Sequence, residues 1–180
     1  MAVIVVGGAG QSVGKTALVC GLIRALPELD WIAVKITRHA HGKAEDIWEE
    51  REAGQGTDTA RYLAAGARRA LLVTAGEQDL ALRLRELEAM LGPGANVIYE
   101  SNRAAEHLRA DLCLAVMGAA ETAPKPSFQG IVERADAMVA RGGGGFASEG
   151  AKPVFSMAEP ERVSAEMREW LRERLARLPG

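Results

Sequence analysis

The feature that most constrains this chain is a glycine-rich stretch near its N-terminus, residues 9–16, with the sequence AGQSVGKT. An apolar run at residues 2–6 precedes it, and a segment with a helical pattern, residues 17–26, follows it. Small residues between a buried strand and a helix let the backbone curl around an anion and direct several N–H groups at it. The start of the helix adds unpaired N–H groups and the positive end of its dipole. The sequence therefore predicts a phosphate-binding turn in an α/β fold.

The end of this stretch, Gly14-Lys15-Thr16, fits the P-loop pattern G-x-x-x-x-G-K-[ST], although Ala9 stands at the first glycine position. In that pattern the lysine reaches the terminal phosphates and the hydroxyl binds Mg²⁺. A dinucleotide-binding turn is disfavoured because the spacing G-x-G-x-x-G is absent. An incidental glycine-rich turn would not explain the flanking strand and helix. The phosphates bound by a P-loop belong to a nucleotide. We expect the nucleotide to be bound by Gly10, Gln11, Ser12, Val13, Gly14, Lys15, Thr16 and Ala17.

Composition limits the class of protein. The chain has 180 residues, of which 48% are apolar, and this predicts a single domain, residues 1–180, with a sizeable core. A formal net charge of −2 gives no general attraction to nucleic acid or to anionic lipid. No apolar run approaches the roughly 18 residues of a membrane span. Cys20 and Cys113 lie far apart in apolar elements, which predicts buried, reduced thiols in a cytoplasmic protein.

Apolar runs and helical patterns alternate along the rest of the chain. We expect strands at residues 2–6, 31–37, 70–74, 96–100, 112–116, 135–141 and 153–155, and helices at residues 17–26, 57–66, 80–91, 104–109 and from about Pro160 onward. Such alternation predicts a three-layer α/β fold, with helices on both faces of a mostly parallel sheet of about seven strands. The acidic stretch at residues 45–52 shows neither pattern, and residues 118–126 and 142–145 are expected to be loops.

Polar residues follow several of the predicted strand ends, where parallel sheets bind their ligands. Glu100 ends the fourth strand, and a carboxylate there would hold the Mg²⁺ water shell or orient a water. Arg38, His39 and His41 follow the second strand, and Arg61 lies on the next helix. Cations and imidazoles gathered in this way suit a second phosphorylated or anionic ligand. The alternatives are ordinary polar loop histidines, or a metal site for which a third ligand is lacking.

Three segments, taken together, resemble one family. They are the P-loop ending at Thr16, residues 34–41 (VKITRHAH), and residues 56–61 (GTDTAR) continuing to Ala65-Gly66-Ala67. In this order they are similar to the B protein of molybdopterin-guanine dinucleotide biosynthesis, a small P-loop protein related to dethiobiotin synthetase. The chain departs from the family pattern after Glu100, where Ser101-Asn102 replaces Gly-Phe, and at Thr57, where the family has lysine.

The resemblance implies a P-loop protein that binds GTP or ATP with Mg²⁺ and hydrolyses it slowly during molybdenum cofactor assembly. Either Thr57 or Asp58 can cap the helix expected at residues 57–66, and the resemblance adds a role for Asp58 at a metal or a phosphate. We therefore expect Lys15, Glu100 and Asp58 to be catalytic, and Thr16, Glu100 and Asp58 to hold the metal. The implied partners are a molybdopterin-type or other phosphorylated small molecule, a cofactor-biosynthesis protein and a second copy of the chain.

Two other functions stay open at this stage. The P-loop could serve an ATP-dependent ligase or kinase acting on a small molecule, in the manner of dethiobiotin synthetase. It could also serve a regulatory protein that binds nucleotide without turnover. The base is not readable from the sequence, because neither Asn96 nor Asn102 lies in an Asn-Lys-x-Asp motif. GTP is therefore implied by the resemblance alone.

Overall fold

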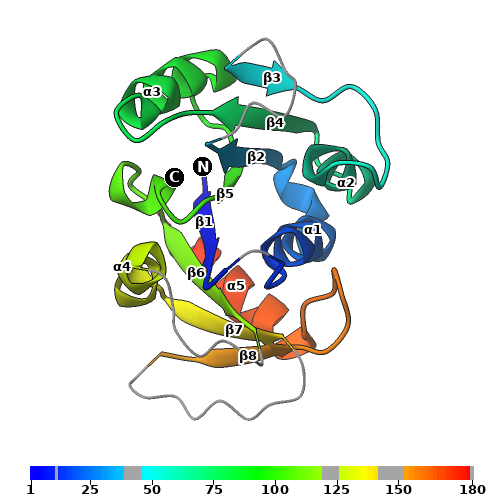
Figure 1. Cartoon of the computed structure of the whole chain (residues 1–180). Coiled ribbons are helices and arrows are strands. Elements are labelled where there is room, and N and C mark those ends of the chain that lie inside the picture. Colours follow the sequence, from blue (N-terminus) through cyan, green and yellow to red (C-terminus); the bar gives the residue numbers. More distant parts are fainter. Residues whose placement is uncertain (11, 39–45, 119–125, 142–151, 179–180) are drawn as a thin grey trace.

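The computed structural model describes residues 1–10, 12–38, 46–118, 126–141 and 152–178. Its strands are β1 (Val3–Gly8), β2 (Ile32–Thr37), β3 (Ile47–Glu49), β4 (Arg69–Thr74), β5 (Val97–Glu100), β6 (Leu112–Met117), β7 (Ala137–Arg141) and β8 (Val154–Met157). They form an eight-stranded sheet in the order β3-β4-β2-β5-β1-β6-β7-β8 (Figure 1). All neighbours pair in parallel except β3, which runs antiparallel to β4.

Helices cover both faces of this sheet. They are α1 (Lys15–Ala25), α2 (Asp58–Ala64), α3 (Leu80–Leu91), α4 (Pro126–Arg134) and α5 (Ala165–Ala176), with short 3₁₀ turns η1 (Pro27–Leu29) and η2 (Ala104–Glu106). Side chains of a strand alternate between its faces, so Ile4 and Val6 pack with α1, α2 and α5, while Val5 packs with α3 and α4. The result is the predicted three-layer arrangement (Figure 1).

Strand β3 is additional to the seven strands that were expected. It lies in the acidic segment, which was predicted to have no regular structure. β3 pairs with β4 in the register Trp48↔Leu72. The pairing is reinforced at its end by Arg69, whose Nε and Nη2 donate to the two carboxylate oxygens of Glu49 at 2.7 and 3.0 Å. Three residues are too few to show a strand periodicity, so tertiary pairing rather than local pattern makes this strand.

Two helices also differ from the expectation. Helix α4 was not predicted, and it buries Phe128 and Ile131 against the sheet. It packs so closely on β1 that a Cβ atom added to Gly7 would lie 2.7 Å from Ile131 Cγ1. The last helix begins at Ala165 rather than near Pro160, because Ser164 caps it by accepting a hydrogen bond from the Met167 N–H at 3.1 Å. No helix within the described residues has the length and apolar character needed to cross a bilayer.

Candidate functional site

The turn between β1 and α1 depends on two glycines. Gly14 precedes α1 with a φ of 105°, in the left-handed region, and an added Cβ would lie 3.0 Å from Arg141 Cδ. At Gly8 an added Cβ would lie 2.8 Å from Lys15 Cγ, so the lysine stem crosses directly over the end of β1. The Lys15 ammonium donates to the carbonyl of Gly10. The turn thus folds the lysine back over the loop, while Gln11 lies outside the described residues.

Asn102 holds the other side of this turn. Its side-chain oxygen accepts from the Gly8 N–H at 2.8 Å, and its amide nitrogen donates to the Gly8 carbonyl at 3.0 Å. These two bonds continue the pairing between β5 and β1 beyond the last strand residues. Asn102 is one of the positions at which the chain departs from the resembled family, and its function here is to fix the entry to the P-loop.

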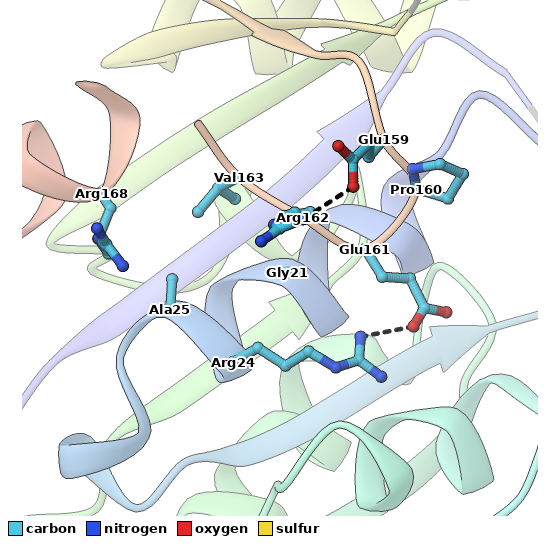
Figure 2. A pocket seen from close by; sticks show the side chains of 9 residues that line it. All are labelled: Gly21, Arg24, Ala25, Glu159, Pro160, Glu161, Arg162, Val163 and Arg168. Carbon is cyan, nitrogen blue, oxygen red and sulfur yellow. Dashed lines mark hydrogen bonds and ion pairs between the residues drawn. The ribbon is translucent and has the colours of Figure 1, made fainter. Parts of the chain in front are cut away.

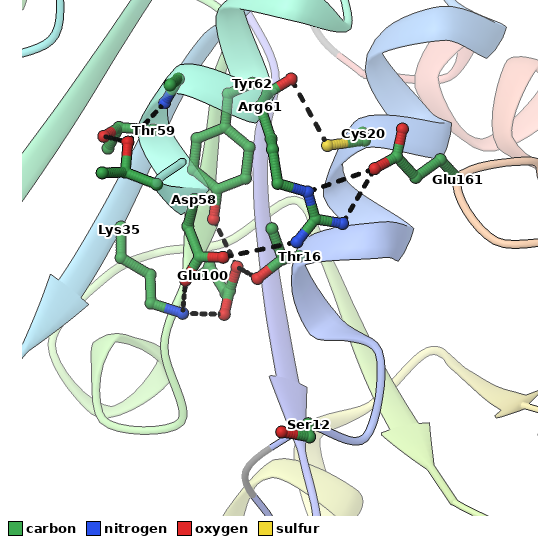
Figure 3. Close-up of polar contacts among 12 residues, drawn as sticks. Ser12, Thr16, Cys20, Lys35, Asp58, Thr59, Arg61, Tyr62, Glu100 and Glu161 are labelled. Atoms are coloured by element: carbon green, nitrogen blue, oxygen red, sulfur yellow. Dashed lines mark hydrogen bonds and ion pairs between the residues drawn. The ribbon is translucent and has the colours of Figure 1, made fainter. Parts of the chain in front are cut away.

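The carboxylate of Glu100 is the centre of a polar cluster (Figure 3). β5 lies beside β1 in the register Val6↔Glu100, which brings this side chain next to the start of α1. Its Oε2 accepts from the Thr16 hydroxyl at 2.8 Å and from the Tyr62 hydroxyl, and its Oε1 pairs with the Lys35 ammonium. Glu100 is only 2% exposed, and the cluster supplies the partners that a buried charge requires.

Asp58 joins the cluster from the first turn of α2. The helix is capped by Thr57, whose hydroxyl accepts from the Ala60 N–H at 3.0 Å, so Asp58 is not the N-cap. Its Oδ2 lies 3.0 Å from the Lys35 ammonium, and its Oδ1 lies 3.6 Å from Arg61 Nη1. A lysine is an unusual residue within an apolar strand such as β2. Lys35 is held there between two carboxylates at the carboxyl end of the sheet.

Burial and charge act in opposite directions on these groups. Burial alone would raise the pKa of Asp58, but its polar and charged neighbours, Lys35 foremost, together lower that pKa below its ordinary value. Burial alone would lower the pKa of Lys35, and Glu100 and Asp58 together raise it. Burial, followed by the charge of Glu100, raises the pKa of Tyr62 well above its usual range. At neutral pH Lys35 is therefore charged, Asp58 is ionised, and the Tyr62 phenol is protonated and donates its hydrogen bond.

The donor set of this cluster fits Mg²⁺. The Thr16 hydroxyl donates to Glu100, Lys35 pairs with both Glu100 and Asp58, and all three oxygen-bearing side chains line the same cavity. Mg²⁺ usually takes few protein ligands and completes its octahedral shell with water and phosphate oxygens. Within the described residues there is no group of three or more His, Cys, Asp and Glu side chains placed to bind a metal. The oxygens at Thr16 therefore suit an ion that is shared with a phosphate ligand.

Arg61 connects this cluster to the segment before α5. Its Nη2 lies 2.8 Å from Glu161 Oε1, and its Nη1 lies 3.6 Å from Asp58 Oδ1. Glu161 also pairs with Arg24 of α1 at 2.5 Å (Figure 2), and it adopts a positive φ of 60°. One carboxylate outside the sheet therefore holds α1 and α2 together and fixes the direction of the Arg61 side chain.

These groups surround a cavity of about 560 Å³, which we call the P-loop cavity. Its lining residues are Ser12, Gly14, Lys15, Thr16, Ala17, Lys35, Thr37, Asp58, Arg61, Glu100, Arg141 and Pro160. Arg141 enters it from the carboxyl end of β7, and its Nη1 donates to the Ser12 carbonyl at 3.1 Å. The sequence did not single out Arg141, Tyr62 or Glu161. Arg141 could have been predicted, because it ends one of the expected strands. Tyr62 and Glu161 are recognised only from their contacts in the structure.

The second group of expected ligand residues is not gathered in the same way. Arg38 pairs with Glu77 at 2.7 Å, is 63% exposed on its side chain, and does not line the P-loop cavity. Arg61 does line it. His39 and His41 lie outside the described residues. Of the two expected second-ligand residues that the structure describes, Arg61 lines the P-loop cavity and Arg38 lies outside it.

A separate cavity of about 380 Å³ lies on the outer side of α1 (Figure 2). Its walls are Gly21, Arg24, Ala25 and Arg168 together with residues 159–163. Pro160 lines both this cavity and the P-loop cavity, so the segment before α5 separates the two. Arg24 and Arg162 are paired here with Glu161 and Glu159 at 2.5 and 3.1 Å, which leaves the cavity with nearly balanced charge.

Comparison with known proteins supports the architecture. No protein-family model and no curated protein matches this chain. The solved structure of LpxK from Aquifex aeolicus in complex with ATP superimposes with a TM-score of 0.56 at 20% sequence identity. The chain has a P-loop NTPase fold. The superposition covers 87% of this chain and 53% of the LpxK chain, so the chain spans about half the length of that protein. The resemblance to the molybdopterin-guanine dinucleotide family rests on the sequence segments alone.

Proposed function

We propose that this protein binds a nucleoside triphosphate with Mg²⁺ in the P-loop cavity and transfers its terminal phosphate to a small molecule. The observation that carries this proposal is the meeting of Thr16, Glu100 and Asp58 beside Lys15 at the start of α1. A P-loop hydroxyl and a strand-end carboxylate are the groups that hold Mg²⁺ in P-loop proteins. The lysine and the N–H groups of the turn supply the positive charge that phosphates require.

The proposed roles follow the positions of the side chains. Lys15 would neutralise the terminal phosphates. Thr16 and Glu100 would hold the metal, either directly through their own oxygens or through its water ligands. The metal, when bound, draws charge from the phosphate oxygens during transfer. Asp58 stands at the side of the cluster away from the P-loop turn, where it can accept a proton or ligate the metal. Arg141 is placed to contact a phosphate from the opposite side of the turn.

The positions of these side chains predict how a nucleotide would lie in the P-loop cavity. Lys35 of β2 and Glu100 of β5 come from strands on one side of β1 in the sheet order, whereas Arg141 comes from β7 on the other side. A Mg²⁺ ion held near Thr16 and Glu100 would neutralise the outer phosphates of a nucleotide, and the terminal phosphate would then lie toward Lys35 and Asp58. The nucleoside then extends toward Arg141 and Pro160.

ATP is the nucleotide that we propose. The LpxK structure that shares this fold is a complex with ATP. Both asparagines of the chain already make structural hydrogen bonds: Asn96 accepts from the Ala2 N–H at 2.8 Å, and Asn102 holds Gly8. Neither is therefore placed to read a guanine in the way of an Asn-Lys-x-Asp motif.

A second candidate function is favoured by the segments at residues 34–41 and 56–61, which resemble the molybdopterin-guanine dinucleotide family. Under this reading the protein is a slow GTPase or ATPase, works as a homodimer, and assists molybdenum cofactor assembly with a partner protein. Turnover that rises with a small-molecule acceptor would favour the kinase, whereas slow turnover that rises only with a partner protein would favour the accessory role. Light scattering tests the dimer.

A thermal-shift screen of ATP, GTP and other nucleotides tests the shared proposal. A ligand that binds only the folded state raises its stability, by about 2.7 kcal/mol at a hundred times its dissociation constant. We expect a triphosphate to raise the melting temperature when Mg²⁺ is present and to do so less when the ion is chelated. A screen in which no nucleotide changes the melting temperature would contradict the proposal.

A further inference from the structure

A further cavity of about 360 Å³ adjoins the end of the P-loop cavity at which the terminal phosphate is expected. We call it the Trp48 cavity, and its lining residues are Lys35, Thr37, Trp48, Gln55, Gly56, Thr57, Asp58, Thr59, Arg61 and Leu72. Lys35, Thr37, Asp58 and Arg61 line both cavities. A molecule in the Trp48 cavity would therefore meet the same charged groups as the phosphate.

One wall of the Trp48 cavity is apolar and comes from the edge of the sheet. Trp48 on β3 and Leu72 on β4 are direct partners in the antiparallel register, so their side chains lie on the same face. Leu72 alternates with Leu71 and Val73, which pack on the α3 side, so it faces the side of α1 and α2. Both residues are only half-buried, and the indole and the leucine together give the cavity an apolar wall.

The opposite wall is polar, and hydrogen bonds hold it in place. The Glu50 Oε2 accepts from the hydroxyls of Thr57 and Thr59 at 3.0 and 3.1 Å. The Gly54 N–H donates to the Ala60 carbonyl at 3.1 Å, which fastens the preceding loop to α2. A site of this kind, part apolar with a few fixed polar groups, is typical of small-molecule pockets.

We propose that the Trp48 cavity binds the phosphoryl acceptor, a small molecule with a flat apolar ring and a hydroxyl group. This inference rests on the proposed function. The ring packs on Trp48 and Leu72, and the hydroxyl points to Asp58 at the junction of the cavities. The acceptor oxygen forms a bond to the terminal phosphorus as the bond to the bridging oxygen breaks. The bridging oxygen leaves with the nucleoside diphosphate, and the hydroxyl proton is released to water.

Binding of a probe alcohol tests the proposal without knowledge of the natural acceptor. The chain has three tryptophans, so ¹⁵N-indole labelling gives three N–H signals, and Trp48→Phe assigns the one of interest. Benzyl alcohol is titrated against the protein with Mg²⁺ and a non-hydrolysable ATP analogue, and glycerol is the polar comparison. We expect benzyl alcohol to shift the Trp48 signal saturably, to leave the buried Trp31 signal unchanged, and to bind more tightly than glycerol.

A pair of variants makes the test specific. Trp48→Ala should weaken benzyl alcohol binding about tenfold, because an aromatic contact of this kind is lost. The control is Trp170→Phe, since Trp170 packs on Phe155 with the ring centroids 5.3 Å apart and does not line the cavity. No saturable Trp48 shift, or equal affinity in Trp48→Ala, would overturn the acceptor site if calorimetry shows that the ATP analogue binds. Failure of the analogue itself to bind would overturn the proposed function, and the acceptor site with it.

Discussion

At the residue scale, Glu100 joins more elements of the site than any other described side chain in the polar cluster. Its carboxylate links β5 to Thr16 of α1, Lys35 of β2 and Tyr62 of α2. A buried carboxylate with partners on every side keeps its geometry when a ligand binds, and preorganisation of this kind is the main source of electrostatic catalysis.

Replacement of Glu100 by glutamine should therefore affect turnover more than nucleotide binding. We expect Glu100→Gln to lower the rate of phosphate transfer or hydrolysis by about 10²–10⁴, while Lys15 and the turn still hold the nucleotide. Steady-state turnover and calorimetric affinity measure the two effects, and circular dichroism checks the fold. Glu106→Gln, at an exposed position on η2, is the matched control. A Glu100→Gln variant with unaltered turnover would remove this residue from the mechanism.

The two cysteines test the packing around the site. Burial, followed by the nearby charge of Glu161, raises the pKa of the Cys20 thiol to about 12. Burial raises the pKa of Cys113 to about 11. The thiolate is the reactive form, so neither cysteine should react with dithiobis-nitrobenzoate in the native protein at pH 8, and both should react after unfolding in guanidinium. A native thiol that reacts as fast as a free one would show that α1 or β6 is more exposed than described.

At the scale of elements, the sequence was informative where one local pattern decided the structure. The P-loop turn, the parallel strands and the presence of a last helix were all predicted. β3 was missed because its three residues depend on pairing with β4. Helix α4 was missed although Phe128 and Ile131 have helical spacing, because the prolines before it had been assigned to a loop.

The proximity of the candidate site residues could be predicted in part. Lys15, Thr16, Asp58 and Glu100 follow strand ends or begin helices, and the structure brings these four together. The bond from Tyr62 to Glu100 and the pairing of Glu161 with Arg61 join residues far apart in the chain. No periodicity or motif records such contacts, so they could only be found once the elements were placed.

The turn between β1 and α1 gives a prediction for stability. Gly14→Ala should destabilise the protein by about 1–2 kcal/mol, because an L-residue is strained at its φ of 105° and the new Cβ would crowd Arg141. Urea unfolding measures the loss. Gly54→Ala is the control, since no heavy atom lies within 4 Å of an added Cβ there, and its effect should stay within about 0.5 kcal/mol. Equal losses for the two variants would show that the turn does not need its left-handed glycine.

At the scale of the whole molecule, the order of the strands explains the site. β2, β5 and β1 lie side by side and in parallel, so Lys35, Glu100 and the P-loop meet at one edge of the sheet. The strands on one side of this centre, β6 to β8, lead to Arg141 and Pro160. Those on the other side, β4 and β3, lead to the Trp48 cavity. The topology thus predicts a linear arrangement of nucleoside, phosphates and acceptor along the carboxyl edge of the sheet.

Calorimetric titration of MgATP into the wild-type protein and into Lys15→Ala tests the central claim most directly. The account predicts that the wild type binds one nucleotide per chain, that Lys15→Ala loses tight triphosphate binding, and that both proteins unfold at a similar urea concentration. The similar stability is expected because the Lys15 ammonium donates to the Gly10 carbonyl in the turn and the side chain belongs to neither apolar core. A Lys15→Ala protein that binds MgATP with wild-type affinity would contradict the account.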